Sequence, residues 1–468
     1  MAFLILLYPL VTVVCEELIL VQTVFRHGDR ASTEDMTSAQ ASAYFYRGKS
    51  HLTNKGLDQA HKLGLSLRRR YVENEFLDAR YLPSEVEFRS SAAKRCLMTA
   101  SATASAMFNR TEDGHPTAVA IFTVPKENHY ICAEHLRCPS IIKEMKKIVG
   151  LANQSVDLDD ILNELYAQEA EILNFTHIVG RSRIQQFSPI FYEHRAGLAV
   201  PQWFNAEARK EADQLLDLTT EFLAGTGKFH NPRWILTRSG KMLYTLLNNQ
   251  RKAAQNLLNG TRFFGFVTHD VVVSALLDSM RVLNVALAPQ RRPDFVAAVV
   301  FELWKKEMQH YVKVLYRRNT ESDEFINLTP KIERCGGGEV CDMEVLEEAV
   351  RCFQTNHPEV LCGDLMFSSC YSSLCSHCCS LLLLHIIYAV TQQGNRVQSL
   401  LETIHSDKAD SSINTVTYET KKPPILPTYF PRGKNHTRTA MESTVFIRTI
   451  LCNYLLLTFT GAGTIKLN

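Results

Sequence analysis

The sequence has almost no net charge, no internal repeat and no recognisable metal-binding framework. Its 468 residues carry a formal charge of +2, so general binding to nucleic acid or another polyanion is not expected, and any recognition of anions must be local. Hydrophobic residues make up 46% and charged residues 21%, an ordinary globular composition with enough apolar material for a large core.

The first fifteen residues are apolar, but this run is too short to span a bilayer with ease. It is typical of a signal peptide cleaved before Glu16, although positive charges at its start are missing; the alternative is a buried first strand. Six N-x-Ser/Thr sequons also favour export: Asn109, Asn153, Asn174, Asn259, Asn327 and Asn435. We therefore expect a protein that is secreted or resides in the lumen of the lysosome or another endomembrane compartment.

Thirteen cysteines are typical of a protein from an oxidising compartment. Cys96 falls in a predicted helix and is expected to be a buried free thiol. Six others in the main body allow fifteen pairings, which the sequence alone cannot distinguish: Cys132, Cys138, Cys335, Cys341, Cys352 and Cys362. Cys335 and Cys341 flank three consecutive glycines, so a small loop closed by this pair fits the sequence.

The pattern of apolar residues divides the chain into four parts. Residues 1–15 form the predicted signal peptide, and residues 16–140 together with 224–362 form a discontinuous α/β catalytic core. Residues 141–223 are helical in pattern, which predicts a helical domain inserted into the core as a cap. Residues 363–468 form an irregular tail that is either a membrane anchor or disordered.

The tail contains an apolar segment and a cluster of cysteines. Leu374–Val390 has about the length of a marginal membrane span, but His377 and His385 interrupt it. Cysteines crowd around its start in the order Cys375-Ser376-His377-Cys378-Cys379. This spacing matches no zinc framework, so we expect no metal site.

Three apolar segments have the residues of buried strands, and each ends in polar residues. The predicted strands are Leu18–Phe25, Val86–Phe88 and Phe263–Thr268. They are followed by Arg26-His27-Gly28-Asp29-Arg30, by Arg89 and by His269-Asp270. Helices are predicted at Asn54–Tyr71 with Thr53 as N-cap, at Ala92–Met107 and at Val271–Met280, and antiparallel strands at Ala297–Leu303 and Tyr311–Tyr316.

The three strand ends predict a site for a compact dianion. Ligands of open α/β sheets bind beyond the carboxyl ends of the strands, where Arg26, Arg30 and Arg89 are expected to meet His269. An arginine fork grips phosphoryl oxygens with two bonds and stays charged at any working pH. Each segment alone is more often a structural loop, and only their joint occurrence favours a site.

His27 is the predicted nucleophile, because a neutral imidazole nitrogen can attack phosphorus. The neighbouring arginines disfavour the imidazolium and keep the ring neutral in mildly acidic solution. Asp270 is predicted to protonate the leaving alkoxide and then to accept a proton from water. Gly28 is expected to leave room for the phosphoryl group and to adopt an unusual backbone angle. No metal or other cofactor is required, since the arginines supply the positive charge.

These residues resemble the histidine acid phosphatases, in their prostatic and lysosomal branch. The resemblance covers roughly Leu18 to Cys362, and its motifs are Val24–Arg30, Leu52–Gly56, Arg89–Ser91 with Arg95–Ala100, and Thr268–Asp270 with Val272-Val273. It implies an α/β fold with a phosphoglycerate-mutase-like core sheet, helices on both faces and an inserted, mainly helical cap. It also implies hydrolysis of small phosphate monoesters at acid pH through a phosphohistidine.

The resemblance assigns a role to each motif residue. His27 is the nucleophile, Asp270 the proton donor, and Arg26, Arg30, Arg89 and His269 bind phosphate. It further implies the disulfides Cys335–Cys341 and Cys138–Cys362, which leave Cys132 to pair with Cys352. It suggests a homodimer and, in some members, a C-terminal membrane anchor.

The sequence departs from the family pattern in two places. Ser32 stands where the family usually has proline, and Ala297-Ala298-Val299 lacks an expected cysteine. Two alternatives to an ordinary acid phosphatase therefore stay open at this point. One is a scaffold that binds a phosphate ligand without turnover. The other is a specialised inositol-phosphate or lysophospholipid phosphatase of the same superfamily.

Overall fold

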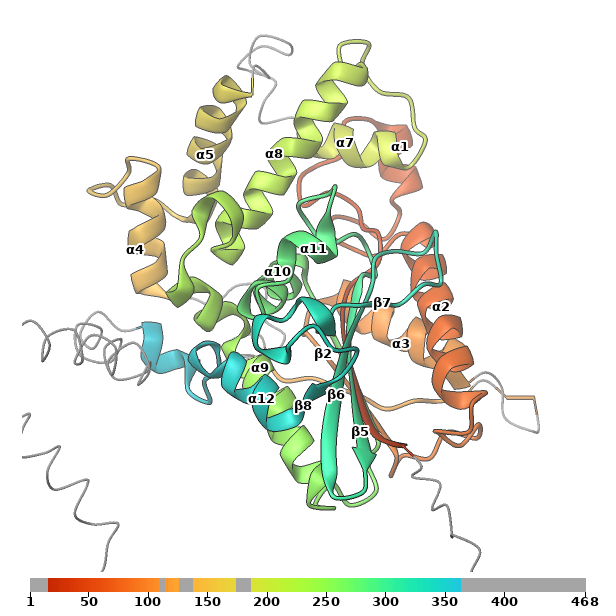
Figure 1. Cartoon of the computed structure of the whole chain (residues 1–468). Helices are drawn as coiled ribbons and strands as arrows, with labels where there is room; N and C mark the ends of the chain where they lie inside the picture. Colours follow the sequence, from red (N-terminus) through yellow and green to blue (C-terminus); the bar gives the residue numbers. More distant parts are fainter. Residues whose placement is uncertain (1–15, 109–113, 116, 126–137, 174–186, 363–468) are drawn as a thin grey trace, which may run out of the picture. The chain divides into compact units, whose positions relative to one another are not determined.

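A central sheet of eight strands organises the protein (Figure 1), and the strand Phe263–Thr268 near its middle is completely buried. The computed structural model describes residues 16–108, 114–115, 117–125, 138–173 and 187–362. The predicted signal peptide, the tail, Cys132 and the sequons at Asn109, Asn174 and Asn435 lie outside the described residues and stay predictions.

The strands follow the order β3-β2-β4-β1-β5-β6-β7, with β8 paired to β6. The parallel half consists of β1 (Glu17–Arg26), β2 (Val86–Ser90), β3 (Ile121–Phe122) and β4 (Phe263–Thr268). The antiparallel half consists of β5 (Ala298–Lys306), β6 (Gln309–Arg317), β7 (Ile326–Asn327) and β8 (Cys341–Asp342). Because β2, β4 and β1 are parallel neighbours, their carboxyl ends meet at one edge of the sheet.

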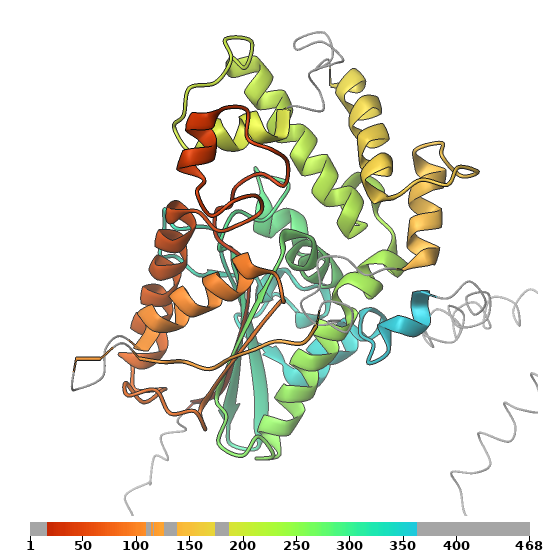
Figure 2. The same ribbon diagram turned by 180° about the vertical axis from the view of Figure 1, so that it is seen from behind.

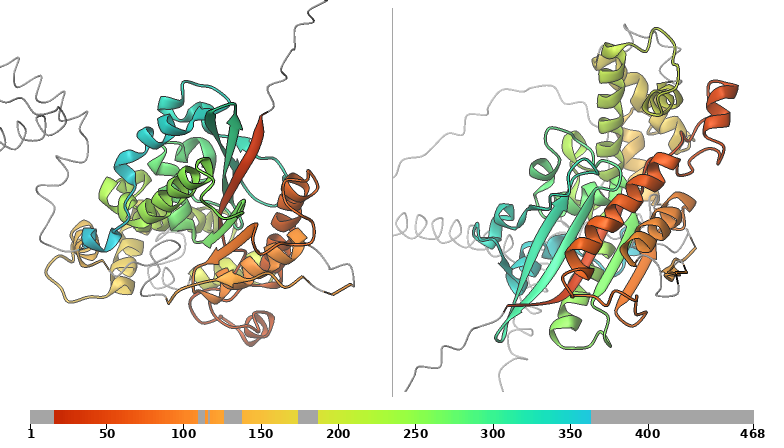
Figure 3. Two further views of the ribbon diagram at one scale, coloured as in Figure 1. Left: turned by 90° about the horizontal axis from the view of Figure 1, so that it is seen from below. Right: turned by 90° about the vertical axis from the view of Figure 1, so that its right-hand side faces the viewer.

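Alternation along the strands supplies two hydrophobic faces. Val21 and Phe25 of β1 pack with residues of α2 (Asn54–Leu67) and α3 (Lys94–Phe108). Leu20 and Val24 point to the other face and pack with α9 (Pro232–Ala254), α10 (Asp270–Ser279) and α12 (Met343–Ala349). Figure 3 shows these helices on the two sides of the sheet. The predicted α/β fold with helices on both faces is confirmed.

The local signals account for where the elements begin and end. The Thr53 hydroxyl accepts a hydrogen bond from Gly56 N at 3.0 Å and caps α2 as predicted. The predicted helix continues beyond α2 as a π-helical turn, Arg68–Val72. The remaining helices are α1 (Ala39–Tyr44), α4 (Pro139–Ile148), α5 (Leu158–Ile172), α7 (Phe187–Arg195), α8 (Ala206–Ala224) and α11 (Leu283–Leu287). Short helical turns lie at Gly227–Phe229, Thr329–Lys331, Glu333–Cys335, Arg351–Phe353 and Pro358–Cys362.

Four helices, α4, α5, α7 and α8, lie beyond the carboxyl ends of the parallel strands (Figures 1 and 2). They have apolar clusters of their own, one around Phe187, Phe204 and Leu215 and another around Ile141 and Phe222. The described part of residues 141–223 is thus helical in the place expected of a cap. Its boundaries as a separate domain stay a prediction.

Two predicted disulfides are present. Cys138–Cys362 joins the start of α4 to the last described residue, and Cys335–Cys341 closes the glycine loop. The pairing of Cys132 with Cys352 involves a residue outside the described part and stays a prediction. Cys96 is fully buried in α3, as expected. Within the described residues, no helix is long and apolar enough to cross a membrane.

Candidate active site

The end of β1 places His27 in the interior, with only 2% of its surface exposed. Its Nδ1 lies 2.8 Å from the carbonyl oxygen of Gly28. A carbonyl oxygen only accepts, so Nδ1 carries the proton and donates it, and the lone pair of the neutral ring is on Nε2. The geometry therefore selects Nε2 as the nitrogen that can attack an electrophile.

The surroundings keep this ring uncharged. Burial lowers the pKa of His27 well below 6.5, and the positive charges of Arg95, Arg26 and Arg30, together with the neighbouring His269, lower it further. An imidazole with such a pKa stays neutral, and nucleophilic, in mildly acidic solution. The predicted electrostatic effect on His27 is thus present, with Arg95 as its largest charged contributor.

Arg26 and Asp270 form an ion pair at the mouth of the strands. Arg26 Nη2 lies 2.6 Å from Asp270 Oδ2, and Nη1 donates to the carbonyl oxygen of Pro293 at 2.7 Å. The guanidinium also stacks 4.2 Å from the ring centre of Phe295. Asp270 is the first residue of α10, and its side chain is 20% exposed, which keeps the carboxylate accessible from the cavity.

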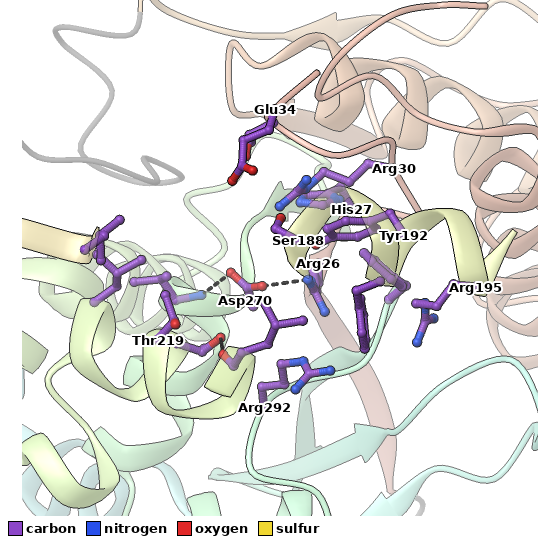
Figure 4. Close-up of a pocket in the computed structure, with 18 of the residues that line it drawn as sticks. Arg26, His27, Arg30, Glu34, Ser188, Tyr192, Arg195, Thr219, Asp270 and Arg292 are labelled. Atoms are coloured by element: carbon purple, nitrogen blue, oxygen red, sulfur yellow. Dashed lines mark hydrogen bonds and ion pairs between the residues drawn. The ribbon is translucent and has the colours of Figure 1, made fainter. Parts of the chain in front are cut away.

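Arg30 lies between the core and the cap. Its Nη1 donates to its neighbour Ala31 O at 2.9 Å, and its guanidinium lies 4.7 Å from the ring centre of Tyr192 on α7. Figure 4 shows Arg30, Arg26, His27 and Asp270 directed into one cavity. Two of the three predicted phosphate-binding arginines therefore meet the predicted nucleophile.

A glycine is needed at position 28 for a different reason from the one predicted. A Cβ at Gly28 would lie 2.4 Å from Gly56 O, and one at Gly56 would lie 2.1 Å from Asp29 O. The two glycines thus allow the loop after β1 to pack directly on the first turn of α2. Gly28 is not among the glycines with positive φ, so the expected unusual backbone angle is absent.

Arg89 does not lie with this cluster in the structure, and its role in binding phosphate stays a prediction. Strand β2 continues to Ser90, so Arg89 lies inside the strand instead of following it. Its Nη2 pairs at 2.8 Å with Glu87, two residues back on the same face, and its side chain is 38% exposed. Arg89 is also absent from the described residues that line the cavity.

Arg95, in the first turn of α3, lies beside His269, although like Arg89 it is not among the described residues that line the cavity. It is 8% exposed, its Nη2 lies 3.3 Å from His269 Nδ1, and it exerts the largest charge effect on His27. Sequence reasoning missed it because Arg95 falls inside a predicted helix and not at a strand end. The signal was available, since Arg95 opens the second half of the motif Arg95–Ala100.

His269 links Arg95 to the end of β2. Arginine only donates, so Nδ1 accepts and Nε2, 3.0 Å from Ser91 Oγ, carries the proton. The ring is fully buried, and its centre lies 5.4 Å from that of His27. Both ring nitrogens contact protein groups, so direct binding of phosphate by His269 stays a prediction.

Ser32 lies where a proline was expected, and its hydrogen bonds hold the loop in place of that rigid residue. Its buried Oγ accepts from Glu34 N at 3.1 Å and lies 3.4 Å from Ser188 Oγ on α7. Its carbonyl accepts from Ser50 N at 2.8 Å. The loop that carries Arg30 is therefore fixed at both the core and the cap, although the proline is missing.

A pair of arginines fastens this site to the cap. Helix α8 presents Asp213, Asp217 and Glu221 at four-residue intervals, which places them on one face. Arg291 binds both carboxylate oxygens of Glu221 at 2.8 and 2.6 Å. Arg292 binds Asp213 and Asp217. We call these five residues the α8 clamp. In the sequence, Arg291 and Arg292 come directly before Pro293, which together with Phe295 contacts Arg26.

Core and cap together enclose a cavity of about 240 Å³ (Figure 4). Its core side consists of Arg26, His27, Arg30, Asp270 and residues near them. Its cap side comes from α5, α7 and α8, and it includes Tyr166, Tyr192 and Thr219. The arrangement can bind an anion at the strand ends and hold a larger group against the cap.

A buried neutral histidine among arginines, with a carboxylate in the same cavity, defines a class of enzymes that attack phosphoryl groups with histidine. The family model described as histidine phosphatase superfamily (branch 2) matches residues 17–317, and the chain belongs to this family. The predicted family resemblance is therefore confirmed.

Relatives and solved structures agree with this assignment. The chain is 30% identical to putative acid phosphatase 1 of Caenorhabditis briggsae, over 74% of this chain and 82% of the relative. It is 23% identical to human prostatic acid phosphatase, over 72% of this chain and 86% of the relative. The Citrobacter braakii phytase structure superposes with a TM-score of 0.52 at 12% identity, covering 74% and 99% of the two chains, which shows a shared fold.

Proposed function

We propose that the protein is an acid phosphatase that hydrolyses phosphate monoesters through a phosphohistidine at Nε2 of His27. The observation that carries this proposal is the protonated Nδ1 of His27, which leaves Nε2 unprotonated in a cavity shared with Arg26, Arg30 and Asp270. Membership of the family and the similarity to named acid phosphatases support the same activity.

The first step forms a P–N bond and breaks the P–O bond of the ester. His27 Nε2 donates its lone pair to phosphorus, and Arg26 and Arg30 bind the phosphoryl oxygens, with Arg95 supplying positive charge from behind. A phosphate dianion that takes Arg26 from Asp270 leaves this carboxyl beside a negative charge, which favours uptake of a proton. Asp270 then gives that proton to the leaving oxygen.

The second step reverses the roles. Water attacks phosphorus, the P–N bond breaks, and the electron pair returns to Nε2 of His27. Asp270, now ionised, accepts the proton that the water loses. Inorganic phosphate leaves, Asp270 releases the accepted proton to the solvent, and its ion pair with Arg26 forms again.

Hydrolysis of an aryl phosphate near pH 5 tests this proposal directly. The wild-type protein is expected to release phosphate, and His27→Ala to lose at least about 10³-fold in kcat, because it removes the nucleophile. Wild-type enzyme quenched in alkali should carry a phosphoryl group on His27 that is stable in alkali and is lost in acid. Equal activity of both proteins contradicts the proposal, and binding of phosphate without turnover favours the alternative scaffold.

The proposed setting is the secretory pathway, in the extracellular space or the lysosomal lumen. Two disulfides support an oxidising compartment. The sequons Asn153 and Asn259 are exposed, whereas the Asn327 amide nitrogen already donates to two oxygens of Glu339 at 2.9 and 2.7 Å. Mass spectrometry of the secreted protein should find glycans at the first two. The homodimer and the tail anchor stay predictions.

A further inference from the structure

The in-line geometry of phosphoryl transfer locates the leaving group. The attacking nitrogen and the leaving oxygen lie on opposite sides of phosphorus. With His27 Nε2 as nucleophile and Asp270 as proton donor, the leaving oxygen must lie near Asp270. Figure 4 shows Asp270 between Arg26 at the strand ends and Thr219 of α8. The leaving group of the proposed reaction therefore faces the cap.

The cap wall in that direction is apolar. It consists of six residues of α5, α8 and α10, which we call the leaving-group wall: Leu158, Leu162, Tyr166, Leu216, Leu223 and Val271. The hydroxyls of Thr219 and Thr220 also line the cavity, but they donate to backbone carbonyls of α8 at 2.8 and 3.1 Å. An apolar group gains by leaving water for such a surface.

The charges beyond the reacting phosphate are balanced or negative. Among the described residues that line the cavity, the cations are Arg26, Arg30, Arg195 and Arg292. Arg292 is bound by two carboxylates of the α8 clamp, and Arg195 Nε lies 3.7 Å from Asp29 Oδ1. A second phosphate would have to displace these two carboxylates to reach Arg292, which removes much of its gain, and the guanidinium of Arg195 lies 5.1 Å from the ring centre of Phe295.

Three further carboxylates also line the cavity: Asp294, which accepts from Phe295 N at 2.8 Å, and the pair Glu34 and Asp159. Figure 4 shows Glu34 at the rim beside Arg30. Burial raises the pKa of Glu34, Arg30 lowers it, and the charge of Asp159 raises it, which places the two carboxylates within electrostatic range. When ionised, this pair repels an anionic substituent on the leaving group and attracts a cationic one. Because the pKa of Glu34 is raised, the discrimination should weaken as the solution is acidified and strengthen towards neutral pH.

We propose that this protein selects monoesters with a single phosphate on an apolar, neutral or cationic leaving group and discriminates against leaving groups that carry further anions. The proposal rests on the proposed phosphatase activity. Its determinants are the leaving-group wall for the apolar body and Glu34 with Asp159 for the charge. Inositol polyphosphates are accordingly poor substrates, in spite of the fold shared with a phytase.

Matched aryl phosphates test the charge selection. The probes are 4-(aminomethyl)phenyl and 4-(carboxymethyl)phenyl phosphate, which have similar size and opposite charge. The wild-type kcat/KM is expected to favour the ammonium compound by about tenfold, and Glu34→Gln/Asp159→Asn should bring the ratio towards one. Asp35→Asn is the control, because Asp35 is the neighbour of Glu34 in sequence, is 88% exposed and does not line the cavity.

A separate pair of substrates tests the role of the leaving-group wall. The wild-type protein should prefer 1-naphthyl phosphate to phenyl phosphate by severalfold, and Leu162→Asn, at a half-exposed position, should reduce that preference. A wild-type charge ratio near one, a ratio unchanged in the double variant, or efficient hydrolysis of inositol hexakisphosphate overturns the selection. Failure to hydrolyse phenyl phosphate at all instead overturns the proposed function.

Discussion

The two sides of the cavity are built in different ways. The core side holds charged groups at strand ends through short, buried contacts, such as Arg26 with Asp270 at 2.6 Å and His27 with Gly28 at 2.8 Å. The cap side presents apolar helix faces, and the hydroxyls of Thr219 and Thr220 donate to carbonyl oxygens of their own helix. The difference indicates that the chemistry belongs to the core and the choice of leaving group to the cap.

The α8 clamp connects the two sides. Arg291 and Arg292 bind the cap helix, and the next residues, Pro293 and Phe295, contact Arg26 of the core. Burial disfavours the charge of Arg292, but the carboxylates of Asp217 and Asp213 outweigh it and raise its pKa. Arg292 therefore stays charged, although burial raises the pKa of its partner Asp217. A displacement of the cap is expected to reach the phosphate site through this loop.

The largest effect on the core side is expected at Asp270. Replacement by Asn keeps the shape and a hydrogen-bond acceptor for Val271 N, but it removes the transferable proton. An alkyl phosphate, whose leaving group needs that proton, should lose about 10³-fold in kcat, and 4-nitrophenyl phosphate only about tenfold. Steady-state kinetics with the two substrates measures the contrast. Equal losses would mean that Asp270 acts in binding and not as the acid.

The next largest effect distinguishes Arg95 from Arg89. Arg95→Ala removes a buried charge beside His269 and should lower kcat/KM by about 10²-fold. Arg89→Ala is the matched control from the same segment, and it should change kcat/KM by less than about threefold, because an exposed ion pair contributes little. The reverse order of effects would contradict the assignment of Arg95.

Arg95 also affects the acid limb of the pH profile. Its charge lowers the pKa of His27, so Arg95→Ala should raise that pKa towards its ordinary value. His27 is active when neutral, and the variant therefore loses activity at a higher pH than the wild type as the solution is acidified. The profile of kcat/KM against pH, which reports the free enzyme, is the measurement; an unmoved acid limb would assign the limb to another group.

Arg95 and Arg89 illustrate what the sequence could and could not predict. The buried strands and amphipathic helices follow from periods of 2 and 3.6 residues, so β1, β4, α2 and α3 were all predicted. Arg89 was misplaced because β2 runs two residues beyond its predicted end, and strand ends are the least certain part of such predictions. The α8 clamp was not predicted, since its pairs join residues about 70 to 80 positions apart and leave no local pattern.

The link between cap and core is expected to give an intermediate effect. Arg292→Ala leaves Asp213 and Asp217 without their partner and frees the loop that supports Arg26, so kcat should fall by about tenfold through misplacement of the phosphate site. Unfolding experiments should also show a loss of about 3 kcal/mol, as for other buried ion pairs that lose one member. Arg281→Ala, in an exposed pair with Glu333, is the control that should change neither quantity.

The variant Arg292→Lys distinguishes an effect on the position of the phosphate site from a general loss of stability. A lysine keeps the charge and binds one carboxylate, so stability should recover more fully than kcat, because the bridge to both Asp213 and Asp217 needs the guanidinium fork. If kcat follows the free energy of unfolding across both variants, the clamp serves folding only.

The smallest effect is expected at Ser32, where core and cap meet by hydrogen bonds alone. Ser32→Ala removes the acceptor of Glu34 N and the contact with Ser188, which should cost about 1 kcal/mol of stability. Since this loop carries Arg30, KM should rise by about two- to threefold with kcat nearly unchanged. Ser42→Ala, at an exposed serine of α1, controls for the loss of a hydroxyl. A larger fall in kcat than rise in KM would show that Ser32 affects the chemical step. The hydrogen bonds of this loop would then stabilise the transition state more than they stabilise the bound substrate.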